Sequence, residues 1–408
     1  MSTITVEQAL QLARSFRQTG QWSAAEALYR RVLAVLPGHA EALAGLASAG
    51  VGAITRPKVG RQLYYAGLPG EGSGWGVCNT QLIRELSKRV FVVTPRSLND
   101  PTRFSDGPVF VPLGYDCSSS SPVRGTRNFA YAFFESELGP SAARNAGQYE
   151  VVFCGSTWCL ERMRDRGIAN GKVLFQGVDH GVFHPVAKVG RQSKNEIRVF
   201  SGGKFEFRKG QDIVIAAFRG LLENYPHARL VCVWHNLWPI LLGSICESRR
   251  LVLPDESFQT QEQLYRELLI RNGIPETNFE ILPLLPQTEL AEVMRSTDIG
   301  VFPNRCEGGT NLVLMEYLAC GRPAVATATT GHADVVGTDH VLTLSPRLTP
   351  RHWDEPDVAE VTAAMGELLK SAPLREKLGA AAAEAMRAWT WERAAQTVFE
   401  TIFPQGTR

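Results

Sequence analysis

The sequence predicts an α/β protein with two doubly wound parallel sheets, preceded by a short all-helical segment. Three observations support this prediction. Residues 1–50 show helical periodicity without a strand signal, short apolar runs then alternate with amphipathic stretches, and the alternation restarts after a second linker at 184–196. The length of 408 residues agrees with two or three domains. We expect domains at 1–50, 61–186 and 195–388, with residues 389–408 as a C-terminal helix.

The N-terminal segment predicts a helical hairpin whose spacing of small and large residues resembles one tetratricopeptide repeat. One such repeat cannot bury its own apolar face. We therefore expect it to pack on the next domain or on a protein partner; a plain hairpin without a binding role is the alternative. The face-forming positions are Ala9, Leu12, Ala13, Phe16, Ala25, Tyr29 and Val32.

The first α/β unit begins after a Gly/Pro-containing linker at 50–60. Short β-rich runs are separated by amphipathic helical stretches at 79–88 and 158–166. This alternation is typical of a largely parallel sheet covered by helices. The predicted strands are 63–66, 90–93, 109–111, 129–133, 151–153 and 173–175.

The second unit repeats the alternation, and residues 357–403 show helical patterns only. Because ligands of open α/β sheets bind at the C-terminal ends of the strands, two such units should share a cleft. The predicted strands are 197–201, 230–234, 279–282, 299–302 and 324–327, and the predicted helices are 211–224, 287–296 and 312–320.

Composition narrows the function. Lys plus Arg is 43 and Asp plus Glu is 41, so the formal charge of +2 gives no support for nucleic-acid binding. Eight scattered cysteines without a C-x-x-C pair favour reduced thiols, and no carboxylate–histidine cluster indicates a metal site. No secretory signal or membrane-length apolar run is visible. We expect a cytoplasmic protein, with peripheral attachment at the inner membrane face left open.

The segment 303–323 is the most informative stretch. A strand leads through a glycine turn into a helix that we expect Thr310 or Asn311 to cap. The N-terminus of that helix favours a phosphate or diphosphate. Glu316 lies within the helix, where its carboxylate can bind a ribose diol. The alternative is a glycine-rich turn with a solvated glutamate.

Two other loops follow the first strand of each unit. In the second unit Gly203 lets the backbone approach a ligand, while Lys204 and Lys209 place cations beside it; a solvated basic loop is the alternative. In the first unit Gly74 and Gly76 belong to a glycine-rich stretch that lacks a regular dinucleotide spacing. We interpret it as a flexible loop covering the phosphates or the acceptor; a plain glycine turn is the alternative.

Three more residues are candidates. Glu135 follows a strand of the first unit and either binds an acceptor hydroxyl or caps the next helix. His235 and His332 lie on loops expected to face the cleft, where a structural role is the more common one.

Together, residues 62–403 resemble a GT-B-fold nucleotide-sugar glycosyltransferase of the retaining glycosyltransferase family 4. Besides the motifs above, 176–185 resembles the stretch before the interdomain linker of that family, and 389–395 resembles its C-terminal helix, which crosses back to the first domain. The resemblance implies a nucleotide-diphosphate sugar as co-substrate, with no permanently bound cofactor and no metal. The bend 282–285 matches the region that frames the nucleobase.

One departure from the family pattern concerns its two glutamates. Glu307 and Glu316 are 316 − 307 = 9 positions apart, one more than in the family motif, so Gly308 aligns with the first glutamate. A bulge around Gly308 and Gly309 would return Glu307 to the donor sugar. With this reservation, we assign catalysis to Lys209, Lys204, Glu307 and Glu135, and donor binding to Gly74, Gly76, Gly203, Leu284, Gly309, Thr310, Asn311, Leu312 and Glu316.

The expected activity is transfer of a sugar from a UDP- or GDP-sugar to a saccharide, a lipid-linked glycan or glycolipid, or a protein acceptor, with retention at the anomeric carbon. The partners expected are that donor, the acceptor and a protein bound by the N-terminal helices, but no nucleic acid. Two alternatives are a GT-B scaffold that binds without turnover and a nucleotide-sugar 2-epimerase of the same fold.

Overall fold

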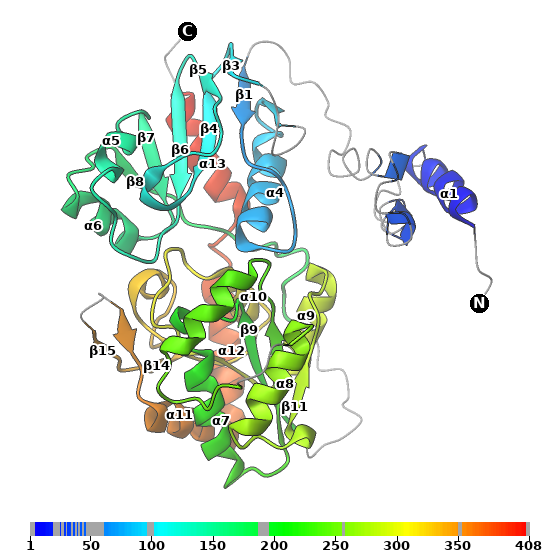
Figure 1. The fold of residues 1–408 in the computed structure, drawn as a ribbon, viewed down its shortest axis with the longest axis vertical. Helices are drawn as coiled ribbons and strands as arrows, with labels where there is room; N and C mark the ends of the chain where they lie inside the picture. The colour runs from blue at the N-terminus through cyan, green and yellow to red at the C-terminus, as the bar shows by residue number, and fades with distance from the viewer. Residues whose placement is uncertain are drawn as a thin grey trace.

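A computed structural model describes residues 61–95, 102–186, 196–254, 258–349 and 353–404, together with 5–18 and parts of 25–45. Figure 1 shows two sheet-containing units along the long axis of the molecule. Each unit holds a six-stranded sheet in which neighbouring strands are parallel. The predicted α/β class with two parallel sheets is therefore confirmed.

The first sheet has the strand order β2-β1-β4-β6-β7-β8. Its helices are α4 (Gly74–Leu86), α5 (Ala142–Ala146) and α6 (Thr157–Asp165). A small parallel pair, β3 (Phe104–Ser105) with β5 (Arg124–Gly125), and the short helix η1 (Tyr115–Cys117) lie outside the sheet. The sheet strands are β1 (Gln62–Tyr65), β2 (Phe91–Val93), β4 (Val109–Leu113), β6 (Asn128–Ala132), β7 (Val151–Cys154) and β8 (Gly171–Val173).

The start of α4 corrects one prediction. The helix was expected from residue 79, with a loop up to Gly76, but it begins at Gly74. The Ser73 hydroxyl caps it by accepting a hydrogen bond from the Gly76 amide at 3.0 Å. Gly74 and Gly76 therefore belong to the first helical turn. A side chain at Gly76 would meet the backbone of Gly70 at 2.9 Å, so its glycine is needed for packing.

The second sheet has the order β11-β10-β9-β12-β13-β14. Every residue of β12 (Ile299–Phe302) and β13 (Ala324–Thr327) is buried, as expected for central parallel strands. A short antiparallel pair, β15 (Arg347–Leu348) and β16 (Asp354–Glu355), follows the sheet. The remaining strands are β9 (Ile197–Gly203), β10 (Ala228–Trp234), β11 (Phe279–Ile281) and β14 (Leu342–Leu344).

Helices cover this sheet and continue to the C-terminal part of the chain. Helix α8 and strand β14 were not predicted; the other helices begin within a residue of the predicted positions or inside the predicted 357–403 stretch. The helices are α7 (Gln211–Leu222), α8 (Gln261–Arg271), α9 (Gln287–Ser296), α10 (Leu312–Ala319), α11 (Val358–Lys370), α12 (Ala372–Met386) and α13 (Trp391–Ile402), with short turns η2 (Phe207–Lys209), η3 (Pro239–Glu247), η4 (Glu276–Asn278) and η5 (Thr330–Asp334).

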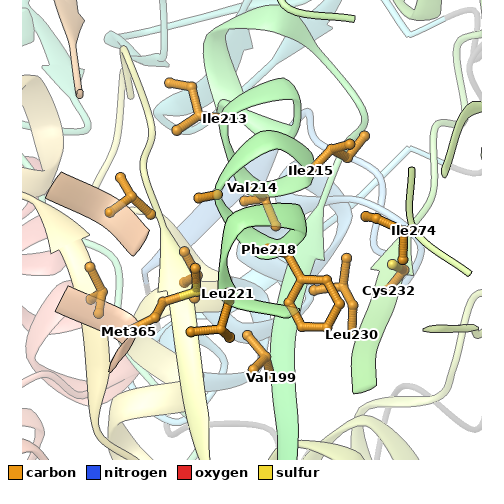
Figure 2. Packing of buried hydrophobic residues seen from close by; sticks show 14 of the residues in the cluster. Val199, Ile213, Val214, Ile215, Phe218, Leu221, Leu230, Cys232, Ile274 and Met365 are labelled. Atoms are coloured by element: carbon orange, nitrogen blue, oxygen red, sulfur yellow. The ribbon is translucent and has the colours of Figure 1, made fainter. Parts of the chain in front are cut away.

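The core of the second unit forms where α7 lies on the sheet (Figure 2). Phe218 and Leu221 of α7 pack against Val199 and Leu230 of the neighbouring strands β9 and β10, and Met365 of α11 joins the same cluster. Burial of each such side chain contributes about 1.5–3 kcal/mol. This packing fixes β9, the strand that leads into the basic loop.

Helix α13 follows the helices of the second unit but packs on the first. Trp391, Ala395 and Val398 are buried in the same cluster as the residues of α4 and of the first sheet. Figure 1 shows α13 beside α4. Side-chain contacts tie it there: Arg89 donates to Gln396 at 2.9 Å. The two units are thus joined by two chain segments.

In the N-terminal part, α1 (Val6–Gln18) is the described helix with complete bounds. Its buried face contains Ala9 and Ala13 as predicted, but Leu12 is 43% exposed and Leu10 is buried instead. The predicted linker at 50–60 and residues 187–195 of the second linker lie outside the described residues.

Candidate functional site

A pocket lies between the two units and is lined by residues of both. The side chains that carry charge come from segments that follow β1, β6, β9 and β12. These are the C-terminal ends of parallel strands, where open α/β sheets bind ligands. Of the predicted site residues, the lining contains Lys204, Lys209, Glu135, Glu307, Gly74, Gly203, Leu284, Gly309, Asn311, Leu312 and Glu316.

Two predicted residues are not brought into this lining, namely Gly76 and Thr310. Gly76 packs against Gly70, as described above. Thr310 is fully buried, and its hydroxyl lies 3.0 Å from the sulfur of Met315. Its side chain is therefore part of the packing beneath the pocket wall.

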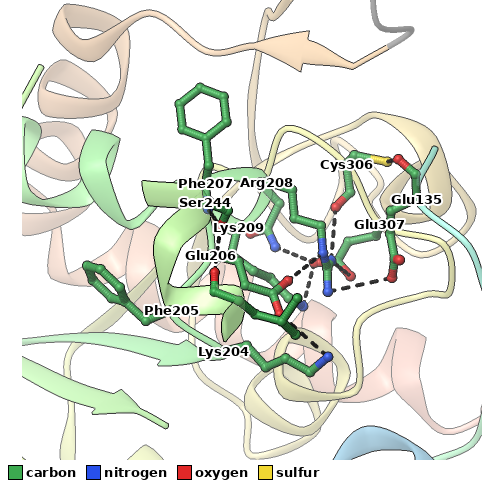
Figure 3. Close-up of polar contacts among 12 residues, drawn as sticks. Glu135, Lys204, Phe205, Glu206, Phe207, Arg208, Lys209, Ser244, Cys306 and Glu307 are labelled. Carbon is green, nitrogen blue, oxygen red and sulfur yellow. Dashed lines mark hydrogen bonds and ion pairs between the residues drawn. The ribbon is translucent and has the colours of Figure 1, made fainter. Parts of the chain in front are cut away.

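The centre of the pocket is a group of paired charges (Figure 3). Glu307 accepts from Lys209 at 2.6 Å and from Arg208 at 3.1 Å. Asn304 donates a further hydrogen bond to Glu307 at 2.5 Å. All three charged side chains are at most 11% exposed. The structure thus brings Glu307 into the pocket despite the extra residue in its motif.

Arg208 extends this group to the other unit. Its guanidinium lies 2.7 Å from Glu206 and 3.5 Å from Glu135, which follows β6 of the first unit. Figure 3 shows Arg208 between these carboxylates. Glu135 does not cap α5, whose N-cap residue is Ser141. Its carboxylate instead faces the pocket and a cation of the opposite unit.

Burial and charge set the protonation of this group. Burial alone would raise the pKa of Glu307, but the cations Lys209 and Arg208 outweigh it and lower that pKa to about 2. Burial lowers the pKa of Lys209, and Glu307 opposes this effect. Glu307 is therefore an anion across the physiological range, and its position fixes the two cations beside it.

Glu316 has the opposite surroundings. Burial, aided by the nearby charge of Asp179, raises its pKa to about 8. Its carboxyl group accepts a hydrogen bond from the side-chain amide of Gln287 at 3.4 Å. The carboxyl thus lies buried at the pocket wall, and no cation of the described residues forms an ion pair with it. A ligand that donates hydroxyl hydrogen bonds there would satisfy it.

The N-terminus of α10 also faces the pocket, through Asn311 and Leu312. Asn311 is the N-cap residue of this helix, one of the two predicted, but its side chain forms no cap hydrogen bond. Asn311 has φ 60° and donates to His332 Nε2 at 2.9 Å instead. Burial lowers the pKa of His332 to about 4, so the ring is neutral and can accept this bond. The helix thus offers uncapped N–H groups to an anion.

Gly308 and Gly309 lie between Glu307 and α10, where the sequence predicts a bulge. A Cβ at Gly308 would lie 2.4 Å from the carbonyl oxygen of Phe134, so the backbone packs closely on the first unit. The carbonyl of Gly308 accepts from the Ser156 hydroxyl at 2.9 Å. These contacts hold the segment between Glu307 and α10 against the first unit, and the bulge itself stays a prediction.

The other predicted residues occupy the rim. Gly203 has φ +111° and open space at its Cβ position, which only glycine readily allows. Lys204 lies 4.9 Å from the ring centre of Trp238 and 3.6 Å from Glu206. Leu284 is 45% exposed at the pocket, and His235 also lines it.

Two arginines were missed from the sequence. Arg208 was passed over although it adjoins Lys209 in the basic loop. Arg305 is 1% exposed and binds both oxygens of Asp212 at 2.8 Å. It also donates to the Phe207 carbonyl at 2.5 Å and so holds the turn that presents Arg208 and Lys209. No spacing in the sequence indicates that Arg305 holds this turn.

Two absences concern the described residues alone. Among them, no group of three or more His, Cys, Asp or Glu side chains could hold a metal ion. None of the helices described above combines the length and the apolar character that crossing a membrane requires.

Comparison with protein families gives two matches. Residues 186–385 match the model described as Glycosyl transferases group 1, and residues 6–49 match that described as Tetratricopeptide repeat. Among curated relatives, a D-inositol 3-phosphate glycosyltransferase of Nocardioides sp. is 26% identical over 71% of this chain. The match spans 61% of that relative's own length.

Solved structures share the fold. Sucrose-phosphate synthase from Thermosynechococcus elongatus superimposes with a TM-score of 0.62 at 15% identity, over 84% of this chain and 98% of that one. HepE of Anabaena, in complex with UDP and glucose, gives 0.60 at 13% identity over 84% and 99%. These neighbours confirm the predicted GT-B architecture.

Proposed function

We propose that this chain, whose residues 186–385 are a glycosyl transferases group 1 domain, transfers a sugar from a nucleotide-diphosphate sugar to an acceptor hydroxyl. The observation that carries the proposal is the joint placement of the two acidic residues of one motif. Glu316 lies buried without a cation, beside a helix N-terminus, while Glu307 lies among Lys209 and Arg208. The surroundings of Glu316 suit a ribose, and those of Glu307 suit a diphosphate and its sugar.

The donor has a place for each of its parts. The ribose hydroxyls donate to the Glu316 carboxylate, and the diphosphate meets the N–H groups at the start of α10. Leu284 borders the nucleobase. The complex of the fold neighbour HepE with UDP and glucose supports a uridine donor, while the sequence resemblance allows UDP or GDP.

The reaction needs stabilisation of the leaving group. The bond between the anomeric carbon and the β-phosphate oxygen breaks, and its electron pair leaves with the nucleoside diphosphate. The acceptor hydroxyl oxygen bonds to the anomeric carbon, and its proton passes to the departing phosphate. Lys209 and Arg208 stabilise the negative charge that develops on the departing diphosphate. Electrostatic stabilisation of this kind is usually the largest single contribution to catalysis. We propose that the substitution proceeds with retention, as the family resemblance implies.

The acceptor side lies on the first unit, with Glu135 near the reacting atoms. A saccharide, a lipid-linked glycan or glycolipid, or a protein are the acceptor classes proposed. We also propose a protein partner for the N-terminal helices, whose residues 6–49 match a tetratricopeptide repeat. We propose a cytoplasmic enzyme that needs neither a metal nor a permanently bound cofactor.

The test is release of nucleoside diphosphate from UDP-, GDP-, ADP- and dTDP-sugars, with mixed acceptors, by wild type and Lys209→Met. We expect one donor class to be used and the variant to lose about a hundredfold or more in kcat, the usual cost of removing one stabilising group. Lys370→Met, an exposed lysine at the end of α11, is the matched control and should behave as wild type.

Wild-type turnover in Lys209→Met would refute the diphosphate assignment. An altered sugar formed without acceptor would indicate a 2-epimerase instead. If the protein neither releases nucleoside diphosphate nor binds a nucleotide, the scaffold alternative is the one that remains.

A further inference from the structure

His332 lies beneath the pocket and not in its wall. The sequence placed it on a loop expected to face the cleft, but its side chain is fully buried in η5, and it is absent from the described residues that line the pocket. Each nitrogen of its ring takes part in one hydrogen bond, with Thr327 on one side and Asn311 on the other. The second of these bonds reaches the start of α10.

These two bonds fix the tautomer of the ring. Nδ1 lies 3.1 Å from the carbonyl oxygen of Thr327, which can only accept, so Nδ1 carries the proton and donates it. Burial lowers the pKa of His332 to about 4, so the ring is neutral and Nε2 keeps its lone pair. Nε2 lies 2.9 Å from Asn311 Nδ2, which is therefore the donor. The side chain of Asn311 is held with its nitrogen toward His332.

Asn311 is the N-cap residue of α10, a position at which asparagine is among the best capping residues. Its Oδ1 atom would cap the helix by accepting from the N–H of Val313 or Leu314. Among the described residues, however, neither Oδ1 nor these two N–H groups have a hydrogen-bond partner. Asn311 and Val313 both line the pocket. An acceptor and two donors that suit each other thus stay apart at the pocket wall.

The backbone of Asn311 agrees with this separation. Its φ of 60° differs from the extended conformation of a typical N-cap residue. A positive φ is uncommon outside glycine, although asparagine tolerates it better than most residues. The hydrogen bond to His332 stabilises this conformation. Without that bond, Asn311 can return to the extended conformation, in which its side chain caps α10.

The loop that carries His332 is tied to the donor-binding segment at two places. Gly331 N donates to the Glu307 carbonyl at 2.9 Å, and the Thr330 hydroxyl accepts from Glu307 N at 2.9 Å. A Cβ at Gly331 would collide with the carbonyl oxygen of Gly309, so only glycine lets the two segments lie this close. Together with the bond to Asn311, these contacts fix both ends of the segment 307–311.

We propose that His332 is a positioning residue, which holds the Asn311 side chain away from the first N–H groups of α10 and so reserves them for the donor diphosphate. This inference rests on the proposed function and deepens it, because it names a residue that prepares the donor site without contacting the donor. An anion at a helix N-terminus is bound by these N–H groups, and a capping side chain competes with it for them.

A double-mutant cycle tests the proposal, with the Kd of a nucleoside diphosphate measured by calorimetry. UDP, GDP, ADP and dTDP are titrated into wild type, and one that binds is used for the variants. His332→Phe keeps a ring but removes its nitrogens, so Asn311 is released. The Kd should rise about fivefold, the usual value of one N-cap side chain. His227→Phe, the same change at an exposed position, should bind as wild type does.

The same substitution is then made in Asn311→Gly, which retains no side chain that could cap α10. Whatever Asn311→Gly does by itself, His332→Phe should cause no further rise in Kd there, because the competing side chain is already absent. A packing defect left by the lost histidine would instead raise the Kd by the same factor in both backgrounds. Equal factors, or an unchanged Kd in His332→Phe alone, would overturn the inference.

A second pair of variants leaves the buried histidine in place. Serine caps helices as well as asparagine does, but its side chain is one atom shorter and cannot donate to His332 from position 311. The Kd should therefore be about fivefold higher in Asn311→Ser than in Asn311→Gly. Equal Kd values in these two variants would contradict the inference, even if His332→Phe does not fold.

Two glutamate variants separate failure of this inference from failure of the proposed function. Glu316→Gln should lose nucleotide affinity, and Glu223→Gln, at an exposed position at the C-terminal end of α7, should keep it. If wild type binds none of the four nucleotides, the proposed function fails and the inference fails with it. If a nucleotide binds through Glu316 but the cycle shows no coupling between His332 and Asn311, only the inference fails.

Discussion

Glu307 and Glu316 are buried carboxylates of one motif whose surroundings drive their pKa values in opposite directions. Cations hold the pKa of Glu307 at about 2, while burial raises that of Glu316 to about 8. Burial of the ionised Glu316 carboxylate thus lowers the stability of the ligand-free protein. Hydrogen bonds from a bound ribose would offset this loss. A buried acid whose pKa is raised in this way is a feature of functional sites more than of structural cores.

This cost predicts a pH-dependent effect of Glu316→Gln. The pKa of Glu316 lies above its usual value of 4.5 in the folded state, so the native protein binds more protons than the unfolded chain between about pH 4.5 and 8. Its contribution to stability therefore declines as the pH rises through that window. Glutamine mimics the neutral acid, so the variant should gain stability over wild type from pH 5 to pH 8.

Thermal unfolding of both proteins without nucleotide at several pH values measures this difference, in which the titration of other groups cancels. If the unfolding midpoints of the variant and of wild type differ by the same amount at pH 5 and at pH 8, Glu316 is solvated in the free protein. A variant that is less stable at pH 8 than at pH 5, relative to wild type, would mean that the carboxylate has a cationic partner.

Some of these residues could be found from sequence and others could not. Lys209 follows β9 and Glu316 lies in the helix after β12. The C-terminal ends of parallel strands lie at one edge of the sheet, so the sequence predicts that both residues reach the same site. Arg208 adjoins Lys209, but the sequence gives no sign that both of these adjacent cations point into the pocket. Arg305 acts through Asp212 and the Phe207 carbonyl, which are distant in sequence. Such contacts depend on tertiary packing.

At the scale of elements, the start of α4 and the presence of α8 differ from the predictions. Helix α4 begins at Gly74, where glycine lowers helix propensity and suggested a loop. The Ser73 cap and packing on the first sheet outweigh that propensity. Helix α8 was missed although Thr260 and Gln263 form a capping box, a signal that sequence does contain.

Two glycines inside helices allow a matched prediction. Gly366 in α11 has open space at its Cβ position, whereas a Cβ at Gly379 in α12 would lie 2.4 Å from the Gly321 carbonyl oxygen. Gly366→Ala should stabilise the protein by up to about 1 kcal/mol, because alanine loses less backbone freedom on folding. Gly379→Ala should destabilise it by about 1–3 kcal/mol, because α12 must move off the end of α10.

Unfolding midpoints of the two variants, measured side by side, test this prediction, since the substitution and the helical setting are the same. Destabilisation by both would mean that Gly366 is not in open space. Stabilisation by both would mean that α12 does not pack against Gly321.

At the scale of the whole molecule, α13 joins the two units. It follows the helices of the second unit, yet Val398 and Ile402 are buried with the first. The sequence pattern identifies an amphipathic helix here, but only the resemblance to a family indicated which unit receives its apolar face. The periodicity of apolar residues shows which face of a helix is buried, but it does not show which part of the protein that face packs against.

Val398→Asp should therefore destabilise the first unit. A carboxylate would be placed in the cluster that contains α4, at a cost of at least about 3 kcal/mol. Arg393→Asp puts the same side chain on the exposed side of α13 and should change stability by less than about 0.5 kcal/mol. Hydrogen exchange of α4 and the first sheet, against that of the second sheet, locates the effect. Equal protection in both variants would contradict the role assigned to α13.

The central claim is that Glu316 holds the ribose of a nucleotide donor in the pocket between the units. Calorimetric titration of wild type, Glu316→Gln and Glu223→Gln with UDP and with GDP tests it most directly. We predict that one nucleotide binds wild type and the Glu223 control alike, and that its Kd rises about tenfold or more in Glu316→Gln, the usual value of a hydrogen bond to a charged group. An unchanged Kd in Glu316→Gln would contradict the account.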